Sequence, residues 1–106
     1  MNAVSEDVEK LVEKELISAN KQFPAFASEH EAWAVMHEEL DECREVFGLL
    51  TRQDVLLWEC MKGNREYADG LVKEMREAAE MLACEAIQVA AMAQKYRDML
   101  GEEEDE

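Results

Sequence analysis

The sequence predicts an all-α protein, a bundle of three to five helices in which two long helices run antiparallel. Three observations favour this class. The 106 residues include one proline and four glycines, too few for the turns of a small all-β domain. Residues that favour helices, such as alanine, glutamate and leucine, dominate the composition. Apolar residues recur at steps of three and four, and no long stretch alternates apolar and polar residues.

The first helix is expected over about residues 5–20. Glu6 and Asp7 stand in its first turn, where the positive end of the helix dipole favours acids. Phe23 and Pro24 follow its last turn, and proline is disfavoured inside a helix. The pattern therefore predicts one helix and a short connection before the next.

A capping box marks the start of the second helix, since Ser28 can cap the amide of Glu31 and Glu31 can reach back. The helix is expected to run to about Leu50. Residues 51–54 either begin a short new helix or continue the long one. Steps of three and four predict the seam that packs on another helix at Trp33, Met36, Leu40, Cys43, Phe47 and Leu50.

The last helix is expected to begin at Asn64 or Asp69, after a C-cap at Gly63, and to end at Leu100. Its seam has steps of four and three throughout: Leu71, Met75, Ala78, Leu82, Glu85, Val89, Met92, Tyr96 and Met99.

Residues 1–100 are expected to form one domain, and Gly101 is expected to stop the last helix before a disordered acidic tail over residues 101–106. Helices this long leave one flank of a short chain uncovered. We therefore expect association of identical chains, as a homodimer or homotetramer, to complete the bundle.

The charge of the chain excludes several kinds of partner. The chain has 26 acidic and 11 basic residues, for a formal net charge of −15. Such a surface repels nucleic acid and anionic lipid, although a cation can bridge it to a nucleotide. No apolar run reaches the roughly 20 residues that cross a bilayer, so no membrane span is expected. Three widely spaced cysteines fit a reducing, cytoplasmic setting.

Glu85 is the irregular member of the last seam. A carboxylate on a packing face is costly unless it has a partner or shifts its pKa. Two explanations remain open. Either the carboxylate meets an Arg, Lys or Tyr side chain, or solvent where the seam rotates outward, or it has a metal-binding or catalytic role.

Two acids of the second helix make the metal explanation more specific. Glu39 and Glu42 stand one turn apart, so both can offer carboxylate oxygens to one ion, and Glu38 is a neighbouring acid. Most pairs with this spacing are solvated faces. Carboxylates on two packed helices, completed by Glu85, suit Mg²⁺ or Mn²⁺. Lys95 and Arg97 either contact a phosphate or complement the end of their helix.

Two stretches, His30-Glu-Ala-Trp-Ala-Val-Met-His-Glu-Glu-Leu-Asp-Glu42 and Leu82-Ala-Cys-Glu-Ala-Ile-Gln-Val-Ala-Ala-Met-Ala-Gln94, carry a resemblance. They cover about a quarter of the chain and resemble the MazG-like nucleoside triphosphate pyrophosphohydrolases, especially the small phage and Firmicutes-type members. The resemblance implies an all-α fold that associates, and Mg²⁺-dependent hydrolysis of a nucleoside triphosphate to the monophosphate and pyrophosphate.

The family pattern is E-x-x-E on one helix and E-x-x-D on a later antiparallel one. It maps onto Glu39 and Glu42, with Glu38 as an accessory acid that can accept the proton of the attacking water, and then onto Glu85 and Gln88. Gln88 stands where the family has aspartate, so that position adds an amide oxygen but no charge. The two halves also lie further apart than is common, which requires extra helix around residues 51–61.

Two alternatives follow from these departures. The first is a non-catalytic helical interaction protein, a degenerate member of the same superfamily, and Gln88 is the feature that favours it. The second is a hydrolase of another pyrophosphate-containing metabolite.

Overall fold

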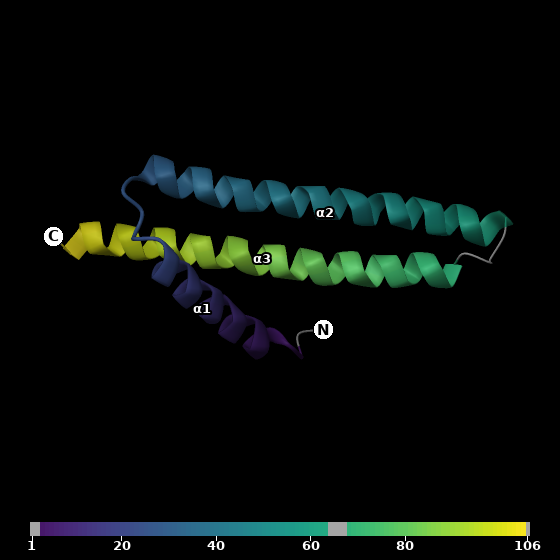
Figure 1. Ribbon diagram of the computed structural model, residues 1–106, viewed down its shortest axis with the longest axis horizontal. Coiled ribbons are helices and arrows are strands. Elements are labelled where there is room, and N and C mark those ends of the chain that lie inside the picture. The colour runs from purple at the N-terminus through teal and green to yellow at the C-terminus, as the bar shows by residue number, and fades with distance from the viewer. Residues whose placement is uncertain (1–2, 64–67, 106) are drawn as a thin grey trace. The chain divides into compact units, whose positions relative to one another are not determined.

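The computed structural model describes residues 3–63 and 68–105, with side chains as far as Gly101. This part of the chain holds three helices and no strand, which confirms the all-α class (Figure 1). The helices are α1 (Ser5–Gln22), α2 (Glu29–Gly63) and α3 (Ala68–Asp105). The predicted helix at Asn64 begins outside the described residues, and Ala68 opens α3 one residue before the alternative, Asp69.

The chain divides into two compact units. The first contains residues 1–40 and 86–106, and the second contains residues 41–85. α2 and α3 each contribute one part to both units. The expectation of one domain over residues 1–100 stays a prediction.

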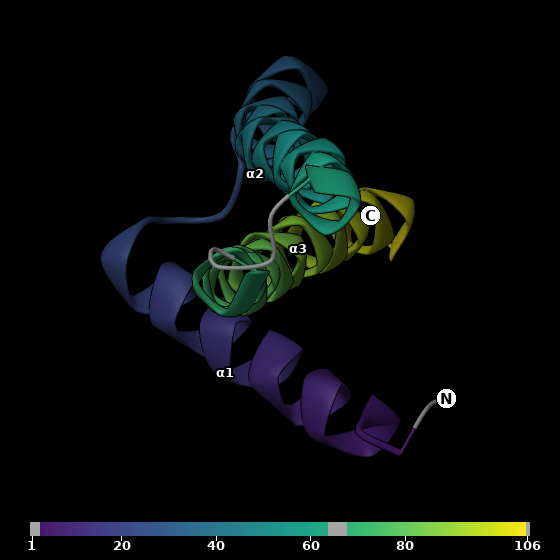
Figure 2. The same cartoon turned by 90° about the vertical axis from the view of Figure 1, so that its right-hand side faces the viewer.

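The first unit contains the hydrophobic core. Phe26 and Ala32 pack there with Ala91, Met92 and Met99, and half-buried residues of α1 cover them, namely Val12, Leu16 and Ala19. Figure 2 shows α1 crossing obliquely beneath α3 in this unit. Burying these side chains supplies most of the driving force for the unit, because apolar area removed from water is the dominant favourable term.

Two hydrogen bonds fix the start of α2. The amide of Glu31 donates to Ser28 Oγ over 3.1 Å, which confirms the first half of the predicted capping box. The hydroxyl of Tyr96 on α3 donates to Glu29 Oε1 over 2.9 Å. The first bond gives an acceptor to one of the amides that a helix leaves unpaired at its N-terminus. The second bond orients the side chain of Glu29, the first residue of α2.

The second unit is an antiparallel pair made by residues 41–63 of α2 and 68–85 of α3. The helix passes residues 51–54 without a break, and Thr51 donates its hydroxyl to the carbonyl of Phe47 over 2.9 Å. This answers the question that the sequence left open in favour of one long helix. Among the described side chains of this unit, only Gln53 and Ala78 are fully enclosed.

The seam predicted for α3 is confirmed, because every one of its nine members is buried or half-buried. The seam predicted for α2 is wrong at three positions. Trp33, Leu40 and Phe47 are 56%, 38% and 62% exposed. The covered face instead follows Ala32, Met36, Glu39, Cys43, Val46, Leu50, Gln53, Leu57 and Cys60. It also has steps of four and three, but two polar residues interrupt it.

The end of α3 differs from the prediction. The helix continues through Gly101 to Asp105, so the expected stop at Gly101 and the disordered tail over residues 101–106 are corrected to helix as far as Asp105. No glycine of the described chain has a positive φ, so Gly101 does not form the left-handed cap that ends many helices. Glutamate is a good helix former, which favours continuation. Glu106 lies outside the described residues.

None of the helices that the structure describes combines the length and hydropathy that crossing a bilayer requires.

Candidate functional site

Two carboxylates, one from each helix, interact in the second unit. Glu85 is half-buried on the seam of α3, and Glu42 is exposed on α2. The side chains of Glu85 and Glu42 interact through a hydrogen bond. This bond, partial burial and the negative charge of Glu42 all raise the pKa of Glu85, with the hydrogen bond as the largest cause. The side chain that interacts with Glu85 here is thus a second acid, Glu42.

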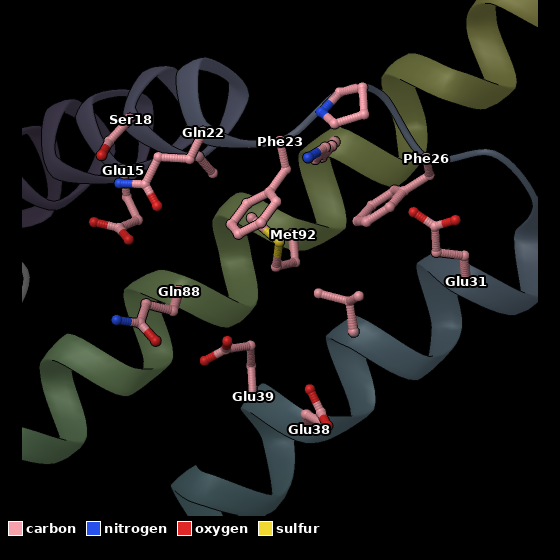
Figure 3. Close-up of a pocket in the computed structure, with 14 residues that line it drawn as sticks. Glu15, Ser18, Gln22, Phe23, Phe26, Glu31, Glu38, Glu39, Gln88 and Met92 are labelled. Atoms are coloured by element: carbon pink, nitrogen blue, oxygen red, sulfur yellow. The ribbon is translucent and has the colours of Figure 1, made fainter.

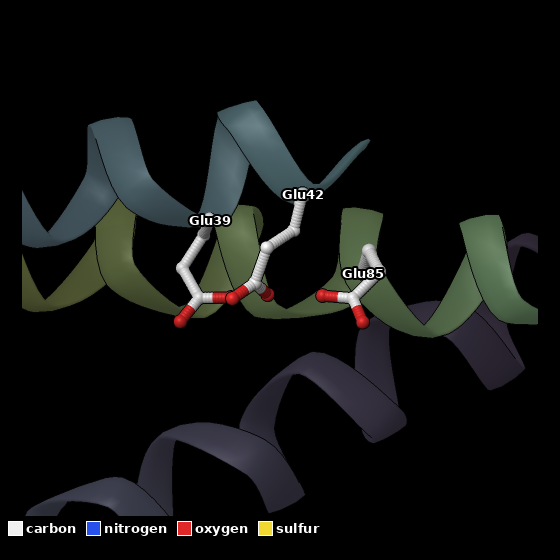
Figure 4. A group of neighbouring side chains, drawn as sticks. All are labelled: Glu39, Glu42 and Glu85. Atoms are coloured by element: carbon white, nitrogen blue, oxygen red, sulfur yellow. The ribbon is translucent and has the colours of Figure 1, made fainter. Parts of the chain in front are cut away.

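Glu39 adds a third carboxylate, one turn before Glu42 on the same helix. One oxygen of Glu42 lies within 4.8 Å of an oxygen of Glu85, and one lies within 4.8 Å of an oxygen of Glu39. Figure 4 shows the three side chains, with the carboxylates of Glu42 and Glu85 turned toward each other. Carboxylate oxygens are the donors that Mg²⁺ and Mn²⁺ prefer, and exposed acidic groups are also common without an ion.

A pocket of about 480 Å³ lies in the first unit. Glu38 and Glu39 of α2 line it, and so does Gln88 of α3. In Figure 3 the side chains of Glu39 and Gln88 extend toward each other across this space. Glu39 is one turn from Glu42 along α2, and Gln88 is one turn from Glu85 along α3.

Lys95 lines the same pocket and is unusually well enclosed for a lysine, at 6% exposed. Its Nζ lies 4.7 Å from the centre of the Phe26 ring. Among the described residues, this ring is the only partner of the ammonium. A buried cation held by an aromatic face keeps its ability to attract an anion. Arg97, in contrast, is exposed and does not line the pocket.

The sequence did not identify several residues of the pocket wall. Phe23, Pro24 and Phe26 come from the connection between α1 and α2, and Glu15 comes from α1. Periodicity within one helix carries no information about which distant segment will face it. The short run of two phenylalanines around a proline was the available signal, because apolar residues in a connection need a surface to cover.

Comparisons with protein-family models, with curated proteins and with solved structures find no match to this chain.

Proposed function

We propose that this protein is a divalent-cation-dependent hydrolase that converts a nucleoside triphosphate into the monophosphate and pyrophosphate. The observation that carries the proposal is the pocket of the first unit. It is lined by four residues that the sequence offers as candidate site residues, Glu38, Glu39, Gln88 and Lys95. Chance grouping of solvated charges does not explain why the lysine among them is buried.

The carboxylates fit a hard cation by their charge as well as by their spacing. The hydrogen bond to Glu42 and the negative charge of Glu42 raise the pKa of Glu85, because two ionised carboxylates would repel there. A divalent cation can neutralise both groups. Glu39, Glu42 and Glu85 would hold Mg²⁺ or Mn²⁺, with the amide oxygen of Gln88 as a neutral donor. When bound, the ion supplies charge neutralisation and makes water easier to deprotonate.

The remaining pocket residues have distinct roles in the proposal. The ammonium of Lys95 attracts the phosphate chain into a surface that is otherwise strongly acidic. Glu38 is exposed within the pocket lining and accepts the proton of the attacking water. Water adds across the anhydride bond between the α- and β-phosphates. One product is the monophosphate and the other is pyrophosphate.

The apolar wall suits the remainder of such a substrate. Phe23, Pro24 and Phe26 supply flat apolar surface beside a few polar groups. Small-molecule sites commonly have this composition, in which the apolar wall covers the ligand and the polar groups orient it. A base and sugar would cover this wall while the phosphates approach Lys95.

The test is pyrophosphate release from a panel of ribo- and deoxyribonucleoside triphosphates, with Mg²⁺ and then with Mn²⁺. We expect metal-dependent release that Glu85→Gln abolishes. Glu77→Gln is the matched control, because it makes the same change at an exposed position of α3. Release that survives Glu85→Gln would contradict the site assignment. Release only from other pyrophosphate-containing metabolites, added to the panel, would change the substrate class.

Gln88 favours a second candidate, a non-catalytic helical interaction protein whose acids form a solvated face. Thermal melting with and without Mg²⁺ or Mn²⁺ separates the two. An ion that binds the folded state raises the midpoint. A solvated acidic face gives only a salt effect, which a monovalent salt of matched ionic strength reproduces.

A further inference from the structure

Two ionic side chains line the pocket of the first unit without pairing with each other. Glu15 of α1 is half-buried there, and Lys95 of α3 is buried. The described residues give the Glu15 carboxylate neither a hydrogen bond nor an ion pair, and Lys95 meets only the Phe26 ring. Both groups thus lose hydration without gaining a polar partner. This arrangement is costly unless a ligand supplies the missing partners.

A ligand that satisfies both groups has opposite features at its two ends. The ammonium of Lys95 attracts an anion, and the proposed reaction gives this role to the phosphates. A carboxylate accepts hydrogen bonds through both oxygens and donates none. The other end of the ligand must therefore present hydrogen-bond donors to Glu15. The pocket, of about 480 Å³, has the size of a small-molecule site.

The α1 side of the pocket has further polar groups and an aromatic ring. Ser18 and Gln22 stand three and seven residues after Glu15, so the three residues share one face of the helix. Figure 3 shows them together on this side of the pocket. Phe23 follows, and its ring is 64% exposed although it lines the pocket. An acceptor, two groups that can donate and a flat ring suit the edge and the face of a nucleobase.

Guanine fits this arrangement better than the other standard bases. Its Watson–Crick edge has two adjacent donors, N1–H and the N2 amino group, with the carbonyl oxygen O6 beside them. The two donors can pair with both oxygens of Glu15, while O6 accepts from the amide of Gln22 or the hydroxyl of Ser18. Adenine and cytosine place a bare ring nitrogen beside their amino group, and uracil and thymine place carbonyls on both sides of N3–H. Each of those edges turns an acceptor toward the carboxylate.

We propose that Glu15 makes the pocket selective for guanine nucleotides, by accepting hydrogen bonds from N1–H and the N2 amino group while Lys95 holds the phosphates. The inference rests on the proposed function for the presence of a nucleotide and adds which base it carries. Selectivity follows because a polar group that is left unpaired in a site strongly disfavours the wrong ligand. Hypoxanthine is the informative analogue, since it keeps N1–H and O6 and lacks only the N2 amino group.

Calorimetric titration with nucleoside monophosphates tests the proposal without any need for turnover. We expect the wild type to bind GMP about tenfold more tightly than IMP, as for loss of a hydrogen bond to a charged group, and UMP more weakly still. Glu15→Gln should weaken GMP binding about tenfold and bring the affinities for GMP and IMP together. Glu13→Gln is the matched control, because it makes the same change at an exposed position of α1 outside the pocket lining. Helical circular dichroism checks that each variant is folded.

Pyrophosphate release from GTP, ITP and UTP separates the choice of base from the reaction. The kcat/KM for GTP should exceed that for ITP, and Glu15→Gln should remove the difference. Equal wild-type values for the guanine and hypoxanthine nucleotides, or a guanine preference that survives Glu15→Gln, would overturn the assignment of Glu15 even if triphosphates are hydrolysed. A preference for GMP that depends on Glu15, without pyrophosphate release, would support the assignment and contradict only the proposed reaction. Neither binding nor hydrolysis of any of these nucleotides would overturn both.

Discussion

The carboxyl groups of Glu42 and Glu85 share a hydrogen bond across the antiparallel helix pair of the second unit. One helix contributes an exposed acid and the other a half-buried acid from the middle of an apolar seam. The raised pKa of Glu85 means that protonation of this group favours the folded state at low pH. At higher pH both carboxylates are ionised and repel, and this is the condition in which we expect a divalent cation to bind.

The stability of the protein should depend on pH through Glu85. Its pKa in the folded state is raised above 4.5, the pKa of an ordinary glutamate. Between these two pKa values the folded chain therefore binds more protons than the unfolded chain. Stability contributed by this group is therefore present below 4.5 and is lost as the pH rises through the raised pKa. Melting midpoints of the wild type and Glu85→Gln, measured from pH 4 to pH 8 without divalent ions, should converge at the acidic end. Parallel curves at all pH values would contradict this.

A carboxylate at position 88 should strengthen cation binding. Gln88 lines the pocket opposite Glu39 and is one turn from Glu85, so Gln88→Asp adds a charged oxygen near the proposed ligands. We expect on the order of tenfold tighter Mn²⁺ binding, because ligand charge strongly tunes the affinity of such sites. Calorimetric titration measures the change. Affinity equal to that of the wild type would mean that residue 88 does not contribute to the site.

Removing the ammonium of Lys95 should affect substrate binding more than folding. Lys95→Met keeps an unbranched chain against Phe26 and removes the charge from the pocket. We expect KM for a nucleoside triphosphate to rise about tenfold, as for loss of a charge-assisted contact of about 1.4 kcal/mol. The melting midpoint should change little.

Arg97→Met is the control for this change, since Arg97 is exposed outside the pocket lining. Its KM should equal that of the wild type. Equal KM values for both variants and the wild type would remove Lys95 from the proposed substrate site.

The sequence predicts the parts of this fold that depend on local pattern. The seam of α3, the capping serine at the start of α2 and the unusual position of Glu85 all follow from spacing along one helix. The choice between two apolar faces of α2 does not. Phe47 belongs to the more hydrophobic stripe and is exposed, whereas the covered face includes Glu39 and Gln53. Packing partners decide this choice, and they are distant in sequence.

Only part of the candidate site was predictable from the sequence, because spacing along one helix does not reveal which distant segments pack against it. Glu39 and Glu42 are one turn apart, so their proximity follows from helix geometry. The proximity of Glu42 to Glu85 depends on the register of two antiparallel helices, which spacing along either helix alone does not give. The burial of Lys95 against Phe26 was not predictable, because it depends on how the connection between α1 and α2 folds back onto α3.

The most direct test of whether Glu85 helps to hold a divalent cation is titration of Mn²⁺ into the protein. Binding is monitored by the loss of the electron paramagnetic resonance signal of the hydrated ion. Wild type, Glu85→Gln and the exposed control Glu77→Gln are compared at pH 7.5 and fixed ionic strength. We predict saturable binding by the wild type and the control, and affinity at least tenfold weaker in Glu85→Gln. Equal binding by all three proteins would contradict the claim that Glu85 helps to hold a divalent cation.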